Sequence, residues 1–312
     1  MENKLLSVII PAFNEEQNIG LASCTISKIL EDENIPYELI FINDGSKDNT
    51  WDFIEKESEK NPCVTGICFS KNFGKEAAIF AGLANAKGDA CVVIDCDLQH
   101  PPEKIVEMYR LWEQGFEVIE GVKADRGKES ALHSLAVKCF YKLISRAVKI
   151  DMSRASDFKL LDRRAVDILL TLREKHAFFR ALSSWIGFKT AEVSYEVRER
   201  VAGETKWSTR SLVKYAITNI ASFSSLPLQF ITFMGVFVLV FSVVLGGIAL
   251  YQKAVHTALA GFTTVICVLL FIGSIIMISL GIIGYYIAKI YDEIKDRPRY
   301  IISKKCEKGE SK

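Results

Sequence analysis

The chain has 312 residues, which is enough for one sizeable domain and a further region. Its 39 basic and 38 acidic residues nearly cancel, so the overall charge gives no reason to expect nucleic acid as a partner. The eight cysteines include no Cys-x-x-Cys pair and no histidine-rich spacing, which argues against a zinc site.

Strand-like and helix-like segments alternate through the first hundred residues. Short apolar runs rich in β-branched residues predict strands, and apolar residues at helical spacing predict helices. The expected strands are 5–11, 37–43, 64–69 and 90–94, and the expected helices are 15–30, 48–60 and 75–86. This alternation is typical of an α/β fold with a mostly parallel sheet and helices on both faces.

Polar residues directly follow each of these expected strands. They are Asn14 and Glu15, Asp44, Lys71 and Asn72, and Asp95 and Asp97. Because ligands bind beyond the carboxyl ends of strands in such sheets, we expect the four clusters to meet at one rim. Each cluster also has a purely structural interpretation, such as a helix cap for Asn14 or a turn for Asp44.

Asp95 and Asp97 end the fourth expected strand, and two prolines soon after prevent it from continuing. Two such carboxylates can converge on one cation where the backbone turns. Mg²⁺ or Mn²⁺ prefers oxygen ligands and is usually held by one or two carboxylates, with phosphate oxygens completing the shell. Since the chain has neither a G-x-G-x-x-G nor a G-x-x-x-x-G-K-[ST] motif, a nucleotide held through a metal is favoured over a dinucleotide fold or a P-loop.

The pattern is less regular after the first hundred residues. It contains an expected strand at 117–122, basic residues at Lys123 and Arg126, an expected helix at 130–148, Asp157 in a Ser-Asp-Phe stretch, and a strand-like segment at 193–197. The loop at 200–206 contains a glycine and has a basic residue at each end, Arg200 and Lys206. A basic patch attracted to anionic lipid is the alternative interpretation of that loop.

Two uncharged apolar stretches, 226–250 and 258–288, occupy the C-terminal third. About 20 apolar residues cross a bilayer as a helix, so both qualify, although a buried hairpin of a soluble protein is the alternative. Basic residues flank the pair, while the connecting loop offers only Lys253 and His256. The positive-inside rule then places the N-terminal domain and both termini in the cytoplasm, at the inner (plasma) membrane. No signal peptide is expected at the N-terminus.

The expected organisation has four parts. They are a cytoplasmic catalytic domain at 1–205, an interfacial amphipathic helix at 206–225, a transmembrane hairpin at 226–289 and a cytoplasmic basic tail at 290–312. Glycines in the apolar stretches permit close helix contacts, either within the hairpin or between the subunits of a homo-oligomer. These glycines are Gly235, Gly246, Gly247, Gly273, Gly281 and Gly284.

Seven segments carry a family resemblance. They are PAFNE at 11–15, NDGS at 43–46, KNFGKEAA at 71–78, DCDLQHPPE at 95–103, SDFKLLDRR at 156–164, RVAGETKW at 200–207 and IYDEIKDRPRYI at 290–301. In this order they resemble the glycosyltransferase family 2 enzymes of the polyprenyl-phosphate type, the bactoprenol glucosyltransferases related to dolichyl-phosphate mannose synthase. The resemblance implies a GT-A fold, a nucleoside diphosphate sugar as donor, Mg²⁺ or Mn²⁺, and undecaprenyl phosphate as acceptor.

The same resemblance implies roles for individual residues. The residues that would bind the nucleotide are Pro11, Phe13, Glu15, Asp44, Lys71 and Asp95, with Asp44 on the base. Asp95, Asp97 and Gln99 would form the metal and diphosphate site. Lys123, Arg126 and Ser134 would contact the acceptor phosphate, and Arg200 and Lys206 would clamp phosphates near the membrane. Lys123 stands where better-known relatives have arginine, and lysine lacks the bidentate fork of a guanidinium.

The reaction that the resemblance implies is an inverting single displacement, with UDP-glucose or another UDP-hexose as donor. A metal with Arg200 and Lys206 would neutralise the charge that builds on the leaving diphosphate. The acceptor phosphate has a second pKa of about 6 and is largely deprotonated at neutral pH. Asp157 resembles the family's candidate base, and with Asp97 it forms the predicted catalytic pair. Because a strong base is less necessary here, Asp157 could orient the sugar or the acceptor instead.

Two rival functions fit parts of the same sequence. A processive polysaccharide synthase would have more membrane spans and a Gln-x-x-Arg-Trp motif, which the chain lacks. A membrane-anchored binding or scaffold protein with a degenerate site would tolerate the loss of Asp95, Asp97 and Asp157, all of which are present.

Overall fold

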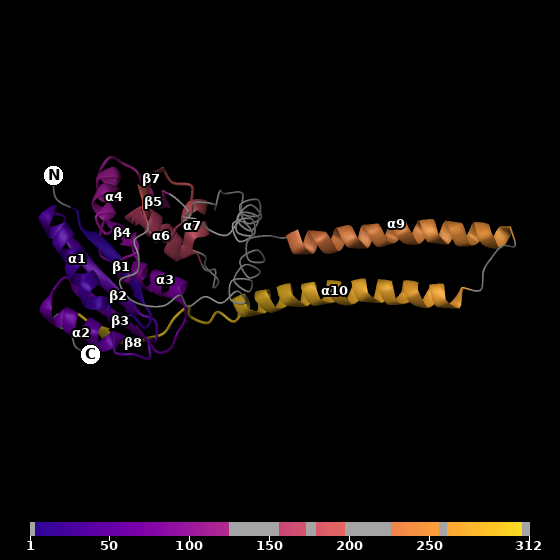
Figure 1. Cartoon of the computed structure of the whole chain (residues 1–312), viewed down its shortest axis with the longest axis horizontal. Helices are drawn as coiled ribbons and strands as arrows, with labels where there is room; N and C mark the ends of the chain where they lie inside the picture. The colour runs from indigo at the N-terminus through magenta and orange to yellow at the C-terminus, as the bar shows by residue number, and fades with distance from the viewer. Residues whose placement is uncertain (1–3, 125–155, 173–178, 197–225, 256–260, 308–312) are drawn as a thin grey trace. The chain divides into compact units, whose positions relative to one another are not determined.

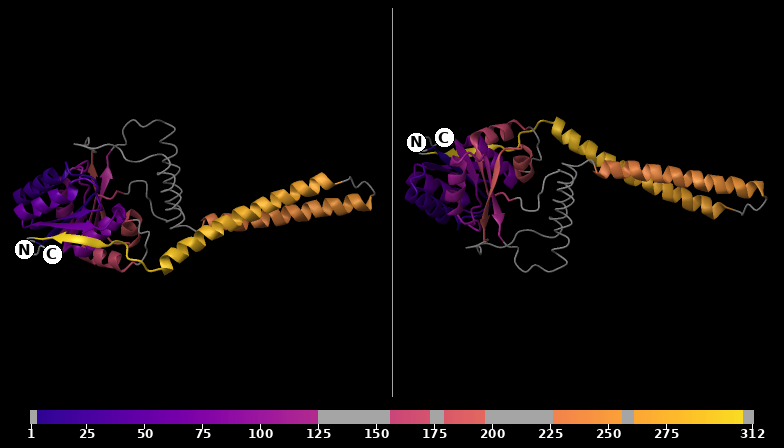
Figure 2. Two further views of the ribbon diagram at one scale, coloured as in Figure 1. Left: turned by 90° about the horizontal axis from the view of Figure 1, so that it is seen from below. Right: turned by 90° about the horizontal axis from the view of Figure 1, so that it is seen from above.

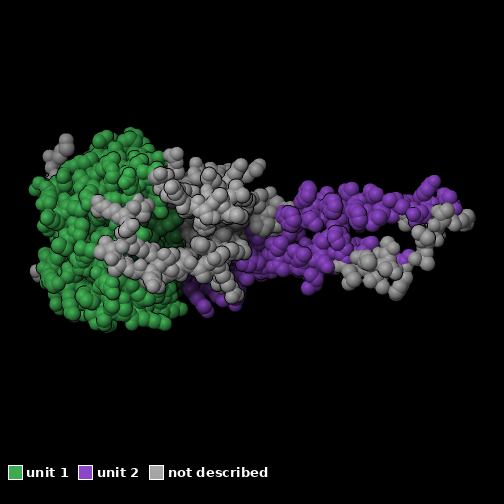
Figure 3. Space-filling model, viewed as in Figure 1, with its two compact units in different colours: residues 1–212, 298–312 green, residues 213–297 purple. Residues whose placement is uncertain are grey.

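The computed structural model describes residues 4–124, 156–172, 179–196, 226–255 and 261–307. The chain forms two compact units (Figure 3). One consists of Met1–Leu212 with Pro298–Lys312, and the other of Val213–Arg297. The helices expected at 130–148 and 206–225 lie outside the described residues.

The first unit is built on an eight-stranded sheet (Figure 1). Its strands are β1 (Leu6–Ala12), β2 (Tyr37–Asn43), β3 (Val64–Phe69), β4 (Ala90–Val93), β5 (Val118–Lys123), β6 (Lys159–Asp162), β7 (Thr190–Tyr195) and β8 (Ile302–Cys306). They follow the order β7-β5-β6-β4-β1-β2-β3-β8. The pairs β1·β2, β1·β4, β2·β3 and β5·β7 are parallel, whereas β3·β8, β4·β6 and β5·β6 are antiparallel. The predicted mostly parallel sheet is therefore confirmed.

Helices cover both faces of this sheet. They are α1 (Ile19–Asp32), α2 (Thr50–Lys60), α3 (Lys75–Asn85), α4 (Lys104–Glu113), α6 (Arg163–Thr171) and α7 (Phe179–Trp185). On one face, Val8 of β1 belongs to a core that includes Ile26 of α1 and Met108 of α4. On the other face, Ile9 of β1 lies against Gly82 of α3. Because both faces are buried, the strands read as continuous apolar runs and not as alternating ones.

The residue expected to cap the first helix has another role. The helix α1 begins at Ile19, well after Asn14, and Asn14 adopts a φ of 54°. The Asn14 side-chain oxygen accepts a hydrogen bond from the backbone N–H of Lys47 at 2.9 Å. The left-handed conformation is one that asparagine tolerates better than most residues. Asn14 therefore ties the loop after β1 to the loop after β2, and its prediction as a helix cap is wrong.

The segment that was expected to be a basic tail contributes the edge strand β8. Just before it, the Tyr300 ring stacks on Phe69 of β3, with centroids 5.1 Å apart, and the Arg299 guanidinium lies 4.5 Å from the ring centroid of Phe80 in α3. Ser70 N–H donates to the Ile301 carbonyl at 3.0 Å. The sequence did not reveal this strand because a short, exposed, lysine-bearing edge strand has no apolar pattern.

The second unit contains two long helices, α9 (Leu226–Ala254) and α10 (Phe262–Ile294), which lie side by side (Figures 1 and 2). The rings of Phe241 in α9 and Phe271 in α10 meet edge to face with centroids 6.5 Å apart. Phe230–Ile248 and Phe271–Tyr291 have mean hydropathies of 2.5 and 2.0. By length and composition, both helices are able to cross a membrane.

The glycines of these helices have no close neighbour among the described atoms of the hairpin. A Cβ added at Gly235, Gly246, Gly247, Gly273, Gly281 or Gly284 would meet no described atom within 4 Å beyond its own chain neighbours and helix backbone. The described atoms therefore show no close intrachain packing at these six glycines. Their use between subunits stays a prediction.

The close approach of α3 to the sheet gives a stability prediction. A Cβ at Gly82 would overlap Cγ2 of Ile9 and lie 2.9 Å from Cδ1 of Ile42. In α1, a Cβ at Gly20 would meet only Oε1 of Glu57, at 3.9 Å. We expect Gly82→Ala to lower the free energy of unfolding by about 1–3 kcal/mol through overpacking. Gly20→Ala should be neutral or raise it by up to about 1 kcal/mol, because alanine is the better helix former.

Denaturant unfolding of the purified protein in detergent would compare the two variants. Equal stability of Gly82→Ala and Gly20→Ala would show that α3 does not depend on this contact with β1.

Candidate active site

Direct contacts join the loops that follow β1, β2, β3 and β4. These contacts are Asn14 N–H to Ser46 Oγ at 2.9 Å, Phe73 N–H to Asp44 Oδ1 at 2.6 Å, and Lys75 Nζ to Asp95 Oδ1 at 2.5 Å. The rim is continuous because parallel strands end on the same edge of a sheet. The predicted convergence of the four polar clusters is therefore confirmed.

Asp44 organises the loop that follows β3. It is buried, and its two side-chain oxygens accept hydrogen bonds from the backbone N–H groups of Phe73 at 2.6 Å and Gly74 at 2.9 Å. Burial raises the pKa of Asp44, and these two hydrogen bonds oppose the rise. Gly45, at a φ of +65°, lies so close that a Cβ there would overlap the Lys71 backbone. The predicted contact of Asp44 with a base stays a prediction.

The other residues predicted to bind the nucleotide lie at the end of β1 and in the loops that follow β1 and β3. Pro11, Phe13 and Glu15 are half-buried at and after the end of β1. Glu15 accepts a hydrogen bond from the Asn18 side-chain amide at 2.6 Å. Lys71 is exposed, and its ammonium lies 5.1 Å from the ring centroid of Phe73.

The predicted metal ligands lie where the chain turns after β4. Leu98 has a φ of 54°, and Asp97 Oδ1 accepts a hydrogen bond from the Gln99 N–H at 3.2 Å. Nearby, Nδ1 of the buried His100 lies 3.8 Å from Asp95 Oδ2. Burial lowers the pKa of His100, against the opposing charge of Asp95. His100 is therefore mostly neutral at pH 7.

The donor set of this turn fits a hard divalent cation that also takes ligands from a substrate. Among the described residues, no group of three or more histidine, cysteine, aspartate or glutamate side chains is placed to hold a metal. Mg²⁺ or Mn²⁺ needs only one or two protein carboxylates when phosphate oxygens and water complete its shell. Asp95 and Asp97 provide hard oxygen ligands of this kind, and both lie beyond the end of β4 at Val93, outside regular strand geometry.

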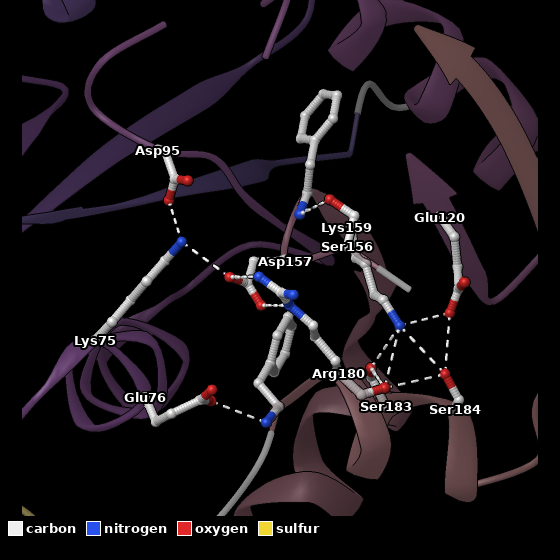
Figure 4. A network of polar contacts seen from close by, with 12 residues as sticks. Lys75, Glu76, Asp95, Glu120, Ser156, Asp157, Lys159, Arg180, Ser183 and Ser184 are labelled. Atoms are coloured by element: carbon white, nitrogen blue, oxygen red, sulfur yellow. Dashed lines mark hydrogen bonds and ion pairs between the residues drawn. The ribbon is translucent and has the colours of Figure 1, made fainter. Parts of the chain in front are cut away.

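Asp157 is fixed between two cations (Figure 4). Lys75 Nζ lies 2.9 Å from Asp157 Oδ2 as well as 2.5 Å from Asp95 Oδ1. The Arg180 guanidinium donates through Nε and one terminal nitrogen to the two Asp157 oxygens, at 2.6 and 2.7 Å. Only 5% of Asp157 is exposed. Burial alone would raise the pKa of Asp157, but the charges of Lys75 and Arg180 hold that pKa well below its usual range.

These contacts decide the chemistry that Asp157 can perform. A carboxylate held ionised by two cations is a poor acceptor for a proton but a rigid anion for orienting other groups. Asp95 is likewise ionised: burial would raise its pKa, and the nearby Lys75 charge lowers it. Burial would also lower the pKa of Lys75, whereas Asp157 and Asp95 raise it above its usual value.

Sequence reasoning missed two members of this group. Lys75 belongs to the KNFGKEAA segment, of which Lys71 was the residue predicted to bind the nucleotide. The helix α3 starts at Lys75 and brings this side chain to Asp95. The recognised segment thus contained a signal for Lys75. Arg180 lies outside all seven segments, and nothing local in the sequence indicated it.

The residues predicted to contact acceptor and leaving phosphates are only partly described. Lys123 is exposed at the end of β5. Arg126, Ser134, Arg200 and Lys206 lie outside the described residues.

The family model of glycosyl transferase family 2 matches residues 7–168, just over half of the chain. The chain belongs to glycosyl transferase family 2. It is therefore a glycosyltransferase, and its sheet and flanking helices form the GT-A type fold that the resemblance predicted.

The similarity to individual proteins covers more of the chain than the family model does. The putative glycosyltransferase CsbB of Bacillus subtilis is 39% identical over 305 residues, covering 97% of this chain and 92% of the relative. The bactoprenol glucosyl transferase of Shigella phage SfII is 36% identical over 302 residues, covering 96% and 97%. A crystal structure of glucosyl-3-phosphoglycerate synthase from Mycobacterium tuberculosis with Mn²⁺, UDP and glucosyl-3-phosphoglycerate is 22% identical. It covers 70% of this chain and 78% of its own, with a TM-score of 0.49.

Glu76, the neighbour of Lys75 on α3, gives a prediction about pH. Its Oε2 accepts the Phe179 N–H at 2.9 Å, and burial together with the Asp157 charge raises the pKa of Glu76 to about 7. An unfolded glutamate loses its proton near pH ~4.3. Between these values the folded state binds more protons, so this group lowers stability as pH rises from about 4 to 7.

Glu76→Gln removes the titration and keeps an acceptor for Phe179. The variant should therefore lose less thermal stability than wild type between pH 5 and pH 8, by about 1 kcal/mol or more, since one pKa unit corresponds to about 1.4 kcal/mol. Thermal unfolding across this range is the measurement. The control is Glu107→Gln, which changes an exposed glutamate paired with Lys104 on α4. Parallel pH profiles for Glu76→Gln and wild type would contradict the prediction.

Proposed function

We propose that this glycosyltransferase transfers a hexose from a nucleoside diphosphate sugar to undecaprenyl phosphate at the cytoplasmic face of the membrane. The observation that carries the proposal is the 36% identity, over 96% of the chain, to a protein named bactoprenol glucosyl transferase. That match runs nearly end to end and so extends into the two apolar helices. A lipid acceptor gives those helices a purpose, because they would bring the site to the headgroups.

The proposed donor is UDP-glucose or another UDP-hexose. Its nucleoside would lie at the loops after β1, β2 and β3, against the residues that the resemblance assigned, Pro11, Phe13, Glu15, Asp44 and Lys71. Asp95, Asp97 and Gln99 would hold Mg²⁺ or Mn²⁺ with the donor diphosphate. Such a cation supplies Lewis-acid stabilisation of the charge on a leaving diphosphate.

The proposed chemistry is an inverting single displacement. An oxygen of the acceptor phosphate would form the new bond to the sugar C1, and the bond from C1 to the donor diphosphate would break. The second pKa of a phosphoester is about 6, so no side chain has to remove a proton from the acceptor at neutral pH. The lack of need for a base agrees with the state of Asp157, which Lys75 and Arg180 keep ionised. An ionised Asp157 is suited to orient the sugar or the acceptor.

Four cationic residues and one serine outside that group complete the proposal. Lys123, Arg126 and Ser134 would contact the acceptor phosphate, and Arg200 and Lys206 would stabilise the leaving diphosphate. The helices α9 and α10 would anchor the enzyme with both termini in the cytoplasm, in line with the basic residues that flank them.

Transfer by the purified protein in detergent tests the function directly. Undecaprenyl phosphate would be offered with UDP-glucose, UDP-N-acetylglucosamine, UDP-galactose or GDP-mannose, and the glycolipid would be measured. We expect transfer from a UDP-hexose, its loss with EDTA, and its recovery with added Mg²⁺ or Mn²⁺. Asp97→Asn should lower the rate by about tenfold or more because a metal ligand is lost.

The control is Asp52→Asn, which changes an exposed carboxylate on α2. No transfer from any of the four donors would refute the proposed acceptor or donor class. Transfer that EDTA leaves unchanged would refute the metal site at Asp95 and Asp97.

Asp157→Asn separates the chemical step from donor binding. If Asp157 orients groups for the reaction, the variant should lower kcat by at least about tenfold while the Kd of the UDP-sugar changes little. Steady-state kinetics and donor titration measure the two quantities. Wild-type turnover by Asp157→Asn would remove Asp157 from the mechanism.

A further inference from the structure

The short helix α7 is held at both ends by residues of other elements (Figure 4). At its start, Phe179 N–H donates to Glu76 Oε2 of α3 at 2.9 Å, and the Phe179 ring meets Phe80 of α3 edge to face. Toward its end, Lys159 Nζ of β6 lies 2.9 Å from Ser183 Oγ and 3.2 Å from Ser184 Oγ. The position of α7 is therefore set by contacts other than the one to Asp157.

Lys159 is a fully buried charge that links three elements. It has 0% exposure and forms a 2.5 Å ion pair with Glu120 of β5, whose side chain is 13% exposed. The other hydrogen bonds of its ammonium go to α7, to the two serine hydroxyls and to the Arg180 carbonyl at 3.4 Å. A buried ammonium is costly unless it is paired and hydrogen-bonded, so this cluster holds α7 against β5 and β6 in one arrangement.

Arg180 follows the first residue of α7 and points its guanidinium at Asp157 (Figure 4). The two hydrogen bonds, at 2.6 and 2.7 Å, fix both the place and the plane of the carboxylate. Lys75 contacts the same carboxylate from α3 but supplies a single point charge. Among the described residues, the planar fork of Arg180 is therefore the contact that fixes the plane of the Asp157 carboxylate.

We propose that Arg180 is a positioning residue that orients Asp157 for transfer, and that the buried ammonium of Lys159 holds α7 so that Arg180 reaches Asp157. This role belongs to the glycosyl transfer proposed above and rests on it. Arg180 acts through Asp157, and a lysine at position 180 would keep the charge and lose the fork.

The first test compares Arg180→Lys with Arg164→Lys, which changes a largely exposed arginine paired with Glu117. We expect Arg180→Lys to lower kcat by about tenfold or more, with the KM of the UDP-sugar within about threefold of wild type. Arg164→Lys should behave as wild type. An unchanged kcat in Arg180→Lys, or a loss confined to KM, would overturn the positioning role.

A double-mutant cycle tests whether Arg180 acts through Asp157. Arg180→Gln combined with Asp157→Asn should be no slower than Asp157→Asn alone, because the second change removes a contact that is already lost. If the fold-losses of kcat in the two single variants multiply in the double variant, Arg180 acts separately from Asp157 and the inference is refuted. The same four proteins should show coupled, non-additive changes in thermal unfolding temperature, and additive changes would refute the contact itself.

The role of Lys159 is tested by removing both charges of its ion pair together. Lys159→Met with Glu120→Gln leaves no unpaired buried charge, which keeps the variant able to fold. It should lower kcat by about threefold or more at an unchanged donor KM. The matched control, Lys104→Met with Glu107→Gln, removes a surface pair on α4. A wild-type kcat in the Lys159 and Glu120 double variant would refute this part.

These outcomes are distinct from failure of the proposed function. If wild-type protein transfers no sugar to undecaprenyl phosphate, the function fails while coupled unfolding still confirms the contact between Arg180 and Asp157. If wild type transfers sugar and Arg180→Lys keeps its kcat, the function stands and the positioning inference fails.

Discussion

The candidate site depends on one chain of alternating charges, in which Asp95, Lys75, Asp157 and Arg180 are each within 3 Å of the next. The Asp157 side chain is only 7% exposed, so removing Lys75 or Arg180 would leave this buried carboxylate without part of its charge compensation. The four residues therefore form a single electrostatic unit. Its members come from the start of α3, the turn after β4, the residues before β6 and the start of α7, so it fixes the relative positions of these four elements.

The rest of the first unit brings these elements into register. Gly82 lets α3 approach β1 closely, which sets where Lys75 stands at the rim. After the long helices, the chain returns to this unit, where Arg299 lies over Phe80 of α3 and Tyr300 stacks on Phe69 of β3. The strand β8 then pairs with β3. Residues near the C-terminus thus pack against α3 and against β3, which lead into the site.

The pairing of Asp157 also bears on the choice of acceptor. A hydroxyl acceptor needs a base to take its proton, and a carboxylate whose pKa is held low by two cations serves that purpose poorly. A phosphate acceptor arrives already deprotonated and needs orientation and charge balance instead. The electrostatics of Asp157 and the proposed lipid phosphate acceptor are therefore mutually consistent.

The sequence by itself determined the family, the parallel sheet and the rim at which the polar loops meet. It placed strands 37–43 and 64–69 to the residue, because buried apolar runs are a local signal. Only the tertiary structure brought Lys75 to Asp95 and Asp157, joined Arg180 to Asp157 and placed β8 against β3. Each of these contacts joins residues that are distant in the chain, and β8 is also an exposed segment without an apolar pattern. Such contacts are decided by how the helices and the edge strand pack on the sheet, and the local spacing of residues does not encode that packing.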